Sequence, residues 1–488
     1  GPKRPMDLRG DPFIPNFFLN FMLCLAVASC GGSAGPSNQP LLDTSAGAAT
    51  KSLFNSNPII IEDAISYYSH ACNDPSFQFL IPLNINDDEH IDFISHFWCD
   101  SITPGEYDNE PTPDALVVHL NDGYGNYSIN NLSVFGEIYP KLGGASRKYA
   151  IGDINNDGKN DIAFAMNWED GRASYDYDSM ISNYSRPALI LSNSNSYEIV
   201  KLGEPDWGHS VQIKNNKVFF AGHKSQVFEL DLNSWNDISS SYPQLSFASF
   251  LLFDEYIVNS VRRDSSQGLE LIKDNEIISS IMFEESFKVN FESWNNAGTN
   301  YYTELGVYNI RGENYFDGMI SEMCKKEDII VASINASKLI SGEIVEGGFY
   351  SESDTTPVVM LALYKVENDK LVAFDKTIKD EEINHNYNFF DCIDVNNDNK
   401  RDITASVFSQ QWNDYDNNRG VPEVYINADD HYYNLDTSNW PTYSDNQDTQ
   451  GYLFDIDMSG TLDLVVFPTK VNSSSKVEIY TTNKNLTD

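Results

Sequence analysis

The chain has 488 residues, of which 41% are hydrophobic and 13% aromatic, which is ample for a large core and exceeds one domain of ordinary length. Its formal net charge of −40 argues against nucleic-acid binding, because phosphates would be repelled, and suits a surface that tolerates salt or binds cations. Asn, Asp, Ser and Tyr are abundant and long Ala/Leu/Glu/Lys runs are absent, which favours strands and turns over helices.

Residues 1–29 have the pattern of a secretory signal peptide. Basic residues precede the apolar run FIPNFFLNFMLCLAVA, which is too short and lies too early for a confident membrane span. The segment ends in VASC at residues 27–30, which resembles the lipobox of bacterial lipoproteins. That resemblance implies cleavage before Cys30 and a lipid on the Cys30 sulfur. The alternative is an ordinary signal peptide with a chance cysteine.

Residues 30–51 are expected to hold the lipidated Cys30 and a flexible tether, because the stretch GGSAGPSNQPLLDTSAGAAT is small and polar. Gly31 stands where similar lipoproteins that stay at the inner membrane have Asp. We therefore expect an exported lipoprotein of the bacterial outer membrane or cell surface, held to the membrane through its lipid alone. Residues 52–488 would form the folded part.

Four cysteines lie beyond the signal segment, at positions 72, 99, 324 and 392. Export permits disulfides, and four cysteines allow three connectivities. Cys72 and Cys99 flank the first of the repeats described next, so we expect this pair first; four free buried thiols are the alternative. None of the four has the spacing of a zinc site.

A nine-residue, oxygen-rich motif occurs four times in the chain. Each copy has Asp, Asn or Ser at positions 1, 3, 5 and 9, and position 7 would add a main-chain carbonyl. The copies are Asn84, Asn86, Asp88, His90 and Asp92; Asp153, Asn155, Asp157, Lys159 and Asp161; Asp394, Asn396, Asp398, Lys400 and Asp402; and Asp455, Asp457, Ser459, Thr461 and Asp463. An EF-hand ends with Glu at position 12, and no copy has it, so the EF-hand interpretation fails.

Short β-rich runs flank each motif, so each loop joins two strands. A second pair of strands follows, as in PDALVVHLNDGYGNYSI at 113–129, which predicts a four-stranded unit. With these features the chain resembles the FG-GAP/VCBS repeat family, which includes the integrin α-subunit head. The resemblance is strong over 77–202 and 389–481. It implies that each unit is one blade of a β-propeller.

Seven first-hairpin turns can be counted along the chain. Besides the four loops, they are Asn215-Asn216, the turn near Asp254, and the segment 305–323, where Arg311 would leave a metal site empty. The prediction is an all-β, seven-bladed β-propeller of four-stranded antiparallel blades, although the length of 324–388 leaves room for an eighth. The last blade lacks a strand, which NPIIIEDAI at 57–65 could supply to close the ring.

Hard oxygen ligands in this number suit Ca²⁺ over Zn²⁺ or Cu²⁺, so we expect about four structural calcium ions. The alternative is that the loops are Asx-turn hairpins without metal. Calcium as a catalyst is not expected, because the protein would supply most of its ligands.

Long loops between the second and third strands should lie on the face opposite the metal loops. Three of them begin with a tryptophan followed by acidic residues and tyrosine: Trp98, Trp168 and Trp412. Such side chains could grip a sugar or act as protein-binding hot spots, or they could pack between blades.

The expected folded part, residues 52–488, contains none of the motifs G-x-S-x-G, H-E-x-x-H, the P-loop or the dinucleotide-binding fingerprint. The favoured hypothesis is therefore a surface protein that binds an extracellular glycan or protein. The alternatives are a polysaccharide lyase or hydrolase built on a calcium-bearing propeller, and a structural subunit of a surface assembly.

Overall fold

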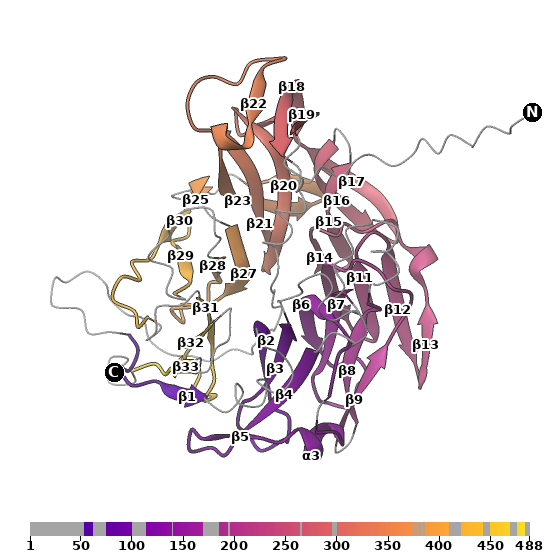
Figure 1. The fold of residues 1–488 in the computed structure, drawn as a ribbon, viewed down its shortest axis with the longest axis vertical. Helices are drawn as coiled ribbons and strands as arrows, with labels where there is room; N and C mark the ends of the chain where they lie inside the picture. Colours follow the sequence, from indigo (N-terminus) through magenta and orange to yellow (C-terminus); the bar gives the residue numbers. More distant parts are fainter. Residues whose placement is uncertain are drawn as a thin grey trace, which may run out of the picture.

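The computed structural model describes residues 53–61, 75–99, 114–138, 140–168, 185–193, 196–263, 266–294, 300–374, 377–378, 382–383, 386–408, 421–442, 449–468 and 476–483. These residues form seven β-sheets, which we number 1 to 7 by the order of their innermost strands along the chain. Figure 1 shows the sheets arranged around a centre, and the fold is an all-β propeller of small, mainly antiparallel sheets.

Sheets 1 to 4 each contain four strands that are paired in chain order. Sheet 1 holds β2 (Pro75–Leu83), β3 (Asp92–Cys99), β4 (Asp114–Asn121) and β5 (Tyr127–Ile129), followed by the short helix α3 (Asn131–Phe135). Sheet 2 holds β6 (Ala145–Gly152), β7 (Asp161–Trp168), β8 (Ala188–Asn193) and β9 (Ser196–Lys201). Sheet 3 holds β10 (Ser210–Lys214), β11 (Lys217–Ala221), β12 (Ser225–Asp231) and β13 (Ser234–Asp237), and the 3₁₀ turn η1 (Ser239–Ser241) follows. Sheet 4 holds β14 (Phe250–Phe253), β15 (Tyr256–Arg263), β16 (Ser266–Lys273) and β17 (Glu276–Met282).

Sheets 5 and 6 depart from the expected four antiparallel strands. Sheet 5 has eight: β18 (Glu284–Trp294), β19 (Asn300–Ile310), β20 (Glu313–Lys326), β21 (Ile329–Leu339), β22 (Phe349–Ser351), β23 (Thr355–Glu367), β24 (Lys370–Ala373) and β26 (Glu382–Ile383), with η2 (Glu352–Asp354) before β23. Sheet 6 has five: β25 (Thr377–Ile378), β27 (Asn386–Ile393), β28 (Asp402–Phe408), β29 (Glu423–Asn427) and β30 (His431–Asn434). The pairs β18–β22 and β25–β30 are parallel. Strands β18, β19 and β22 extend beyond the other sheets at the top of Figure 1.

Sheet 7 is completed by the N-terminal strand, as the sequence predicted. Its strands are β31 (Thr449–Phe454), β32 (Asp463–Pro468), β33 (Val477–Tyr480) and β1 (Ile59–Ile61). Strand β1 runs antiparallel to β33, with Ile59 opposite Ile479. The backbone before it is also held, because the N–H of Asn55 donates to the Thr481 carbonyl and the N–H of Asn483 donates to the Leu53 carbonyl.

Successive sheets are joined by shared clusters of buried apolar side chains. Sheets 7, 1 and 2 share a cluster that includes Phe467, Phe77 and Tyr149. The other neighbours share clusters that include these pairs: Leu189 and Val211 (sheets 2 and 3), Phe219 and Phe250 (3 and 4), Leu269 and Ile330 (4 and 5), Val331 and Ile403 (5 and 6), and Val424 and Leu464 (6 and 7). Core strands such as β4 are buried at consecutive positions and not at alternate ones, because both of their faces pack against neighbouring sheets.

The prediction that 305–323 holds a first-hairpin loop was wrong. Arg311 and Gly312 form the turn between β19 and β20, and the Arg311 guanidinium donates to the Leu361 carbonyl within the same sheet. The turn equivalent to that at Asp254 follows β20 at Glu327, which has a similar positive φ of 49° against 50°. Lys325 beside it forms an ion pair with Asp254. The sequence misled because any tight hairpin favours Asn, Gly and acidic residues.

Candidate metal loops and the opposite face

The four oxygen-rich loops occupy equivalent places in the fold. Each joins the two innermost strands of its sheet: β2 to β3, β6 to β7, β27 to β28, and β31 to β32. These are sheets 1, 2, 6 and 7, which are neighbours in the arrangement of Figure 1. The loops therefore lie in one sector of the protein.

The aspartate at position 9 has the same two hydrogen bonds in every loop. One carboxylate oxygen accepts the N–H of position 2, and the other accepts an N–H at the end of the third strand or just after it. The donors are Ile85 and Asn121 for Asp92 (2.9 and 2.8 Å), Ile154 and Ser192 for Asp161 (2.7 and 2.7 Å), Val395 and Asn427 for Asp402 (2.9 and 2.8 Å), and Ile456 and Thr482 for Asp463 (3.0 and 2.8 Å). Position 9 thus fastens the loop to the third strand.

Position 1 closes the loop on itself in three of the four copies. The carboxylate oxygens of Asp153, Asp394 and Asp455 accept the N–H groups of positions 5 and 6, at 2.7 to 3.1 Å. The first loop has Asn84 there, and its Oδ1 is buried with no hydrogen-bond partner. A buried carbonyl oxygen without a donor is costly, and a bound cation would satisfy it.

The donor set fits a hard cation best in the fourth loop. Ligand oxygens of Asp455, Asp457 and Asp463 lie within 4.8 Å of one another, and among the described residues this is the group of His, Cys, Asp and Glu side chains close enough to hold a metal ion. Three converging carboxylates are the chemistry that Ca²⁺ prefers. The fourth loop and the orphan Asn84 oxygen of the first loop therefore both fit a bound cation.

Burial raises the pKa of the position-9 carboxyls, and their backbone N–H donors oppose the rise. The pKa of Asp92 rises to about 6, and those of Asp402 and Asp463 rise to about 7. Burial raises the pKa of Asp161 as well. A divalent cation beside these groups would favour their ionised form.

The side chains at position 7 of the first three loops contact groups outside the metal-ligand positions, whereas the Thr461 hydroxyl of the fourth loop lies 2.7 Å from the Ser459 hydroxyl at position 5. Lys159 pairs with Asp87 of the neighbouring first loop at 2.7 Å, and Lys400 pairs with Asp429 at 2.5 Å. The His90 ring lies over Gly123, where an added Cβ would come within 2.3 Å of its Nε2. In the first three loops this leaves the main-chain carbonyl as the group that position 7 could offer to a metal.

The residues after the third strand were missed by the sequence analysis. Asn121, Ser192, Asn427 and Thr482 hold the position-9 carboxylates through their N–H groups, and the Ser192 hydroxyl also donates to Asp157 and Asp161. The sequence contains a pattern that could have identified them, because a small polar residue recurs at this position in LND, LSN, INA and TTN. These residues are also typical of hairpin turns, so the pattern alone did not indicate a contact with the loop.

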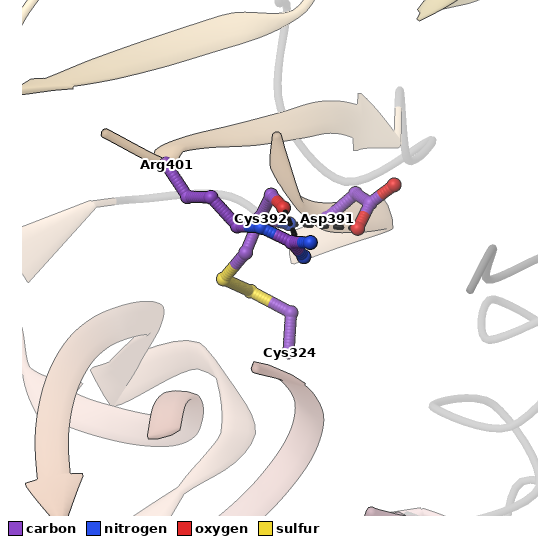
Figure 2. The surroundings of a disulfide bond; sticks show 4 residues. All are labelled: Cys324, Asp391, Cys392 and Arg401. Atoms are coloured by element: carbon purple, nitrogen blue, oxygen red, sulfur yellow. Dashed lines mark hydrogen bonds between the residues drawn. A yellow bond between two sulfur atoms is a disulfide. The ribbon is translucent and has the colours of Figure 1, made fainter. Parts of the chain in front are cut away.

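A disulfide joins Cys324 of β20 to Cys392 of β27 and so links sheets 5 and 6 covalently (Figure 2). If all four cysteines pair, this bond leaves Cys72 and Cys99 as partners for each other. Cys72 and the side chain of Cys99 lie outside the described residues, so that pair stays a prediction. Cys30 lies outside them too.

The tryptophan-rich face is described only in part. Trp98 is the penultimate residue of β3 and Trp168 is the last residue of β7, but their side chains and all of Trp412 lie outside the described residues, so their predicted equivalence stays a prediction. Near this face a different aromatic group is visible. The rings of His209 and Phe247 contact Trp207, and His223 stacks on it at 5.2 Å. Trp207 and His209 are buried, which supports a packing role.

One buried constellation has the residue types of a hydrolase triad. The Oγ of Ser146 lies 2.7 Å from Nδ1 of His96, and Nε2 of His96 lies 3.4 Å from a carboxylate oxygen of Asp114. All three side chains are buried, so a substrate has no route to the serine. The group instead connects sheet 1 to sheet 2.

Among the described residues, no helix is long and apolar enough to span a membrane. No protein-family profile matches this chain, and no curated protein sequence is similar to it.

Solved structures resemble it in fold. They include the N-terminal domain of Nup159 (8% identity, TM-score 0.31, 67% of this chain and 73% of that one). Others are a quinoprotein alcohol dehydrogenase-like protein from Bacteroides thetaiotaomicron (9%, 0.32, 84% and 91%) and the β-propeller domain of the trilobed protease from Pyrococcus furiosus (11%, 0.26, 72% and 93%). Similarities of this size extend to the propeller shape and no further.

Proposed function

We propose that this protein is an exported, lipid-anchored, calcium-stabilised propeller of seven blades that binds an extracellular glycan or protein. Each of the seven sheets would be one blade, with the β18–β19 hairpin and β22 as an extension of the fifth. The single observation that carries the proposal is the fourfold recurrence of one loop, with the same position-9 hydrogen bonds, beside the first strands of four sheets.

Calcium would be held by oxygens of positions 1, 3, 5 and 9 and by the carbonyl of position 7. The Asp455, Asp457 and Asp463 side chains are the set with three converging carboxylates. When bound, the cation would neutralise the loop carboxylates and so remove their mutual repulsion. Because position 9 is also bonded to the end of the third strand, metal binding would stiffen the whole blade and not the loop alone.

Membership of the FG-GAP/VCBS repeat group is part of this proposal. Its support is the motif itself, with a strand on each side of every loop, and a ring completed by the N-terminal strand. Export and lipidation at Cys30 are supported by the lipobox-like VASC segment. The Cys324–Cys392 disulfide is consistent with an oxidising compartment.

Ligand binding is assigned to the face that carries Trp98, Trp168 and Trp412. The metal loops lie at the ends of the first and second strands, so the three long loops that follow β3, β7 and β28 begin at the opposite ends of these antiparallel sheets. Long loops on a rigid scaffold are the usual carriers of binding residues. The enclosed Ser146–His96–Asp114 group gives no support to hydrolysis.

The test is a binding and turnover assay of the chain from residue 31 onward, loaded with calcium. It would be incubated with a panel of soluble polysaccharides, and both co-elution and polymer size would be followed by chromatography. Co-elution with intact polymer supports the proposal, and replacing Trp98, Trp168 and Trp412 by Ala should abolish it. Tyr124→Ala is the matched control, because Tyr124 is 91% exposed but lies in the β4–β5 turn on the metal-loop side. Shortened polymer would instead indicate a lyase or hydrolase.

A protein ligand is the second form of the same proposal. If no polysaccharide co-elutes, a pull-down from cell envelopes with the same tryptophan variants and the same control tests it. Lipid anchoring has a separate test, in which Cys30→Ala should move the protein from the membrane fraction to the soluble fraction. Unchanged fractionation would remove the lipoprotein part of the proposal and leave the binding part standing.

A further inference from the structure

A small cavity of about 60 Å³ lies between the innermost strands of four sheets. Strands β2, β6, β27 and β31 all contribute to its wall, and Figure 1 shows these strands around the centre of the ring. A cavity of this size holds a few water molecules or one small ligand. It is separate from the metal loops, which lie at the ends of the same strands.

Aromatic residues form a large part of the wall of the cavity. Tyr149, Phe390, Tyr452 and Phe454 line it, and one acidic residue, Asp391, lies among them. No lysine, arginine or histidine lines it. The polar groups of two wall residues are already engaged, because the Tyr452 hydroxyl donates to the Leu80 carbonyl and the Ser406 hydroxyl donates to the Gly451 carbonyl.

Asp391 forms no ion pair with a basic side chain of the described residues, although the charge of nearby Arg401 lowers the pKa of its carboxyl group. One of its oxygens accepts the N–H of Cys392 at 2.7 Å. The nearby guanidinium of Arg401 donates instead to the Cys392 carbonyl, at 3.3 Å (Figure 2). In Figure 2 the carboxyl group of Asp391 points away from the disulfide. A carboxylate that is largely shielded from water and held in no ion pair is unfavourable, and a cation in the cavity would stabilise it.

We propose that this cavity binds a small organic cation of the alkylammonium class, with Asp391 as its counter-ion and the four aromatic rings around its methyl groups. Aromatic faces together with one carboxylate are the chemistry that recognises such cations. A calcium ion would need six to eight oxygen ligands, which this wall does not offer. The chain's net charge of −40 would also concentrate cations near the protein.

Burial raises the pKa of Asp391 to about 7, and the N–H of Cys392 and the charge of Arg401 oppose the rise. A bound ammonium group would favour the ionised form. The site does not depend on the function proposed above, since neither the metal loops nor the tryptophan-rich face contributes a residue to its aromatic wall.

Calorimetric titration of the calcium-loaded protein with choline tests the proposal, with 3,3-dimethyl-1-butanol as the neutral compound of the same shape. Choline should bind, and the neutral compound should bind at least tenfold more weakly. Asp391→Asn should weaken choline binding at least tenfold. Glu198→Gln is the matched control, because Glu198 is exposed on β9 and does not line the cavity. It should leave the affinity for choline unchanged. Phe454→Leu, which keeps an apolar side chain but removes a ring, should weaken binding several-fold.

Three results would overturn the inference. Equal binding of the two compounds would show an apolar cavity without cation recognition. Equal choline affinity in the wild type and Asp391→Asn would show that the carboxylate is not the counter-ion. Absence of choline binding, or its displacement by sodium at equal concentration, would exclude an organic cation. If Asp391→Asn fails to fold, the comparison of choline with its neutral analogue and the Phe454→Leu variant still decide the matter.

Discussion

Phe54 offers the sharpest test of how the ring is closed. Its side chain is only 2% exposed and packs edge-to-face on Trp440 with ring centroids 5.0 Å apart, between sheets 6 and 7. Replacing a buried Phe by Ala in a core costs about 3–5 kcal/mol. An aromatic pair adds about 0.5–1.5 kcal/mol beyond burial. We therefore expect Phe54→Ala to destabilise the protein by about 4 kcal/mol.

The assay is urea unfolding of the calcium-loaded chain, followed by tryptophan fluorescence. Hydrogen exchange of β33 would be measured in parallel, because loosening of β1 should expose that strand first. Ile60→Ala is the matched control, because Ile60 lies on β1 but is 39% exposed, and it should cost less than about 1 kcal/mol. Equal destabilisation by the two variants, or no loss of protection in β33 on Phe54→Ala, would refute the idea that Phe54 fastens the closing strand.

The other predictions concern the loops, the disulfide and a buried histidine. Asp463→Ala leaves the N–H groups of Ile456 and Thr482 without acceptors, so it should lower the free energy of unfolding by about 2–4 kcal/mol, measured by thermal unfolding in the presence of a chelator. Asp457→Ala, at an exposed position of the same loop, should lower it little in the absence of metal. Calcium should raise the wild-type melting temperature and should raise that of both variants less; equal calcium effects in all three would refute a site in this loop. Reduction of Cys324–Cys392, which are 68 residues apart, should destabilise the protein by about 4 kcal/mol, and a Cys324→Ser/Cys392→Ser variant should be insensitive to reductant. Burial lowers the pKa of His119 from its ordinary 6.5 to about 3, so the folded state resists its protonation. The stabilisation from neutral, buried His119 is intact above pH 6.5 and is lost as the pH falls toward 3, by about 1.4 kcal/mol per pH unit. His119→Asn should therefore reduce the fall of unfolding free energy with decreasing pH, and an unchanged pH dependence would contradict the burial argument.

Local chemistry explains why some of this architecture was predictable. The four loops were found because their oxygens recur at fixed spacing, and the closing strand was found because the last blade lacked one. The fifth sheet could not be read from the sequence, because β18, β19 and β22 are added to it without a repeated motif. Arg311 was assigned to the wrong turn because polar hairpins resemble each other in composition.

Tertiary pairing explains most of what was missed at the sites. The N–H donors of Asn121 and Thr482 reach their carboxylates only after the third strand folds back beside the loop. Cys324 and Cys392 carry no spacing signal, because neighbouring sheets bring them together. The central cavity is likewise assembled from strands of four sheets, and no local pattern marks Asp391 as part of its wall.

The pairing of Ile59 with Ile479 has a consequence for biogenesis. A chain that is synthesised from its N-terminus presents β1 first, yet its partner β33 is the last of the described strands to emerge. The strand must therefore wait without a partner while the other sheets form, and ring closure is the final step. Contacts of such large sequence separation form slowly, so the longest-lived folding intermediate would be an open ring with one exposed edge on β33. A chaperone that protects extended, unpaired strands would act on that intermediate.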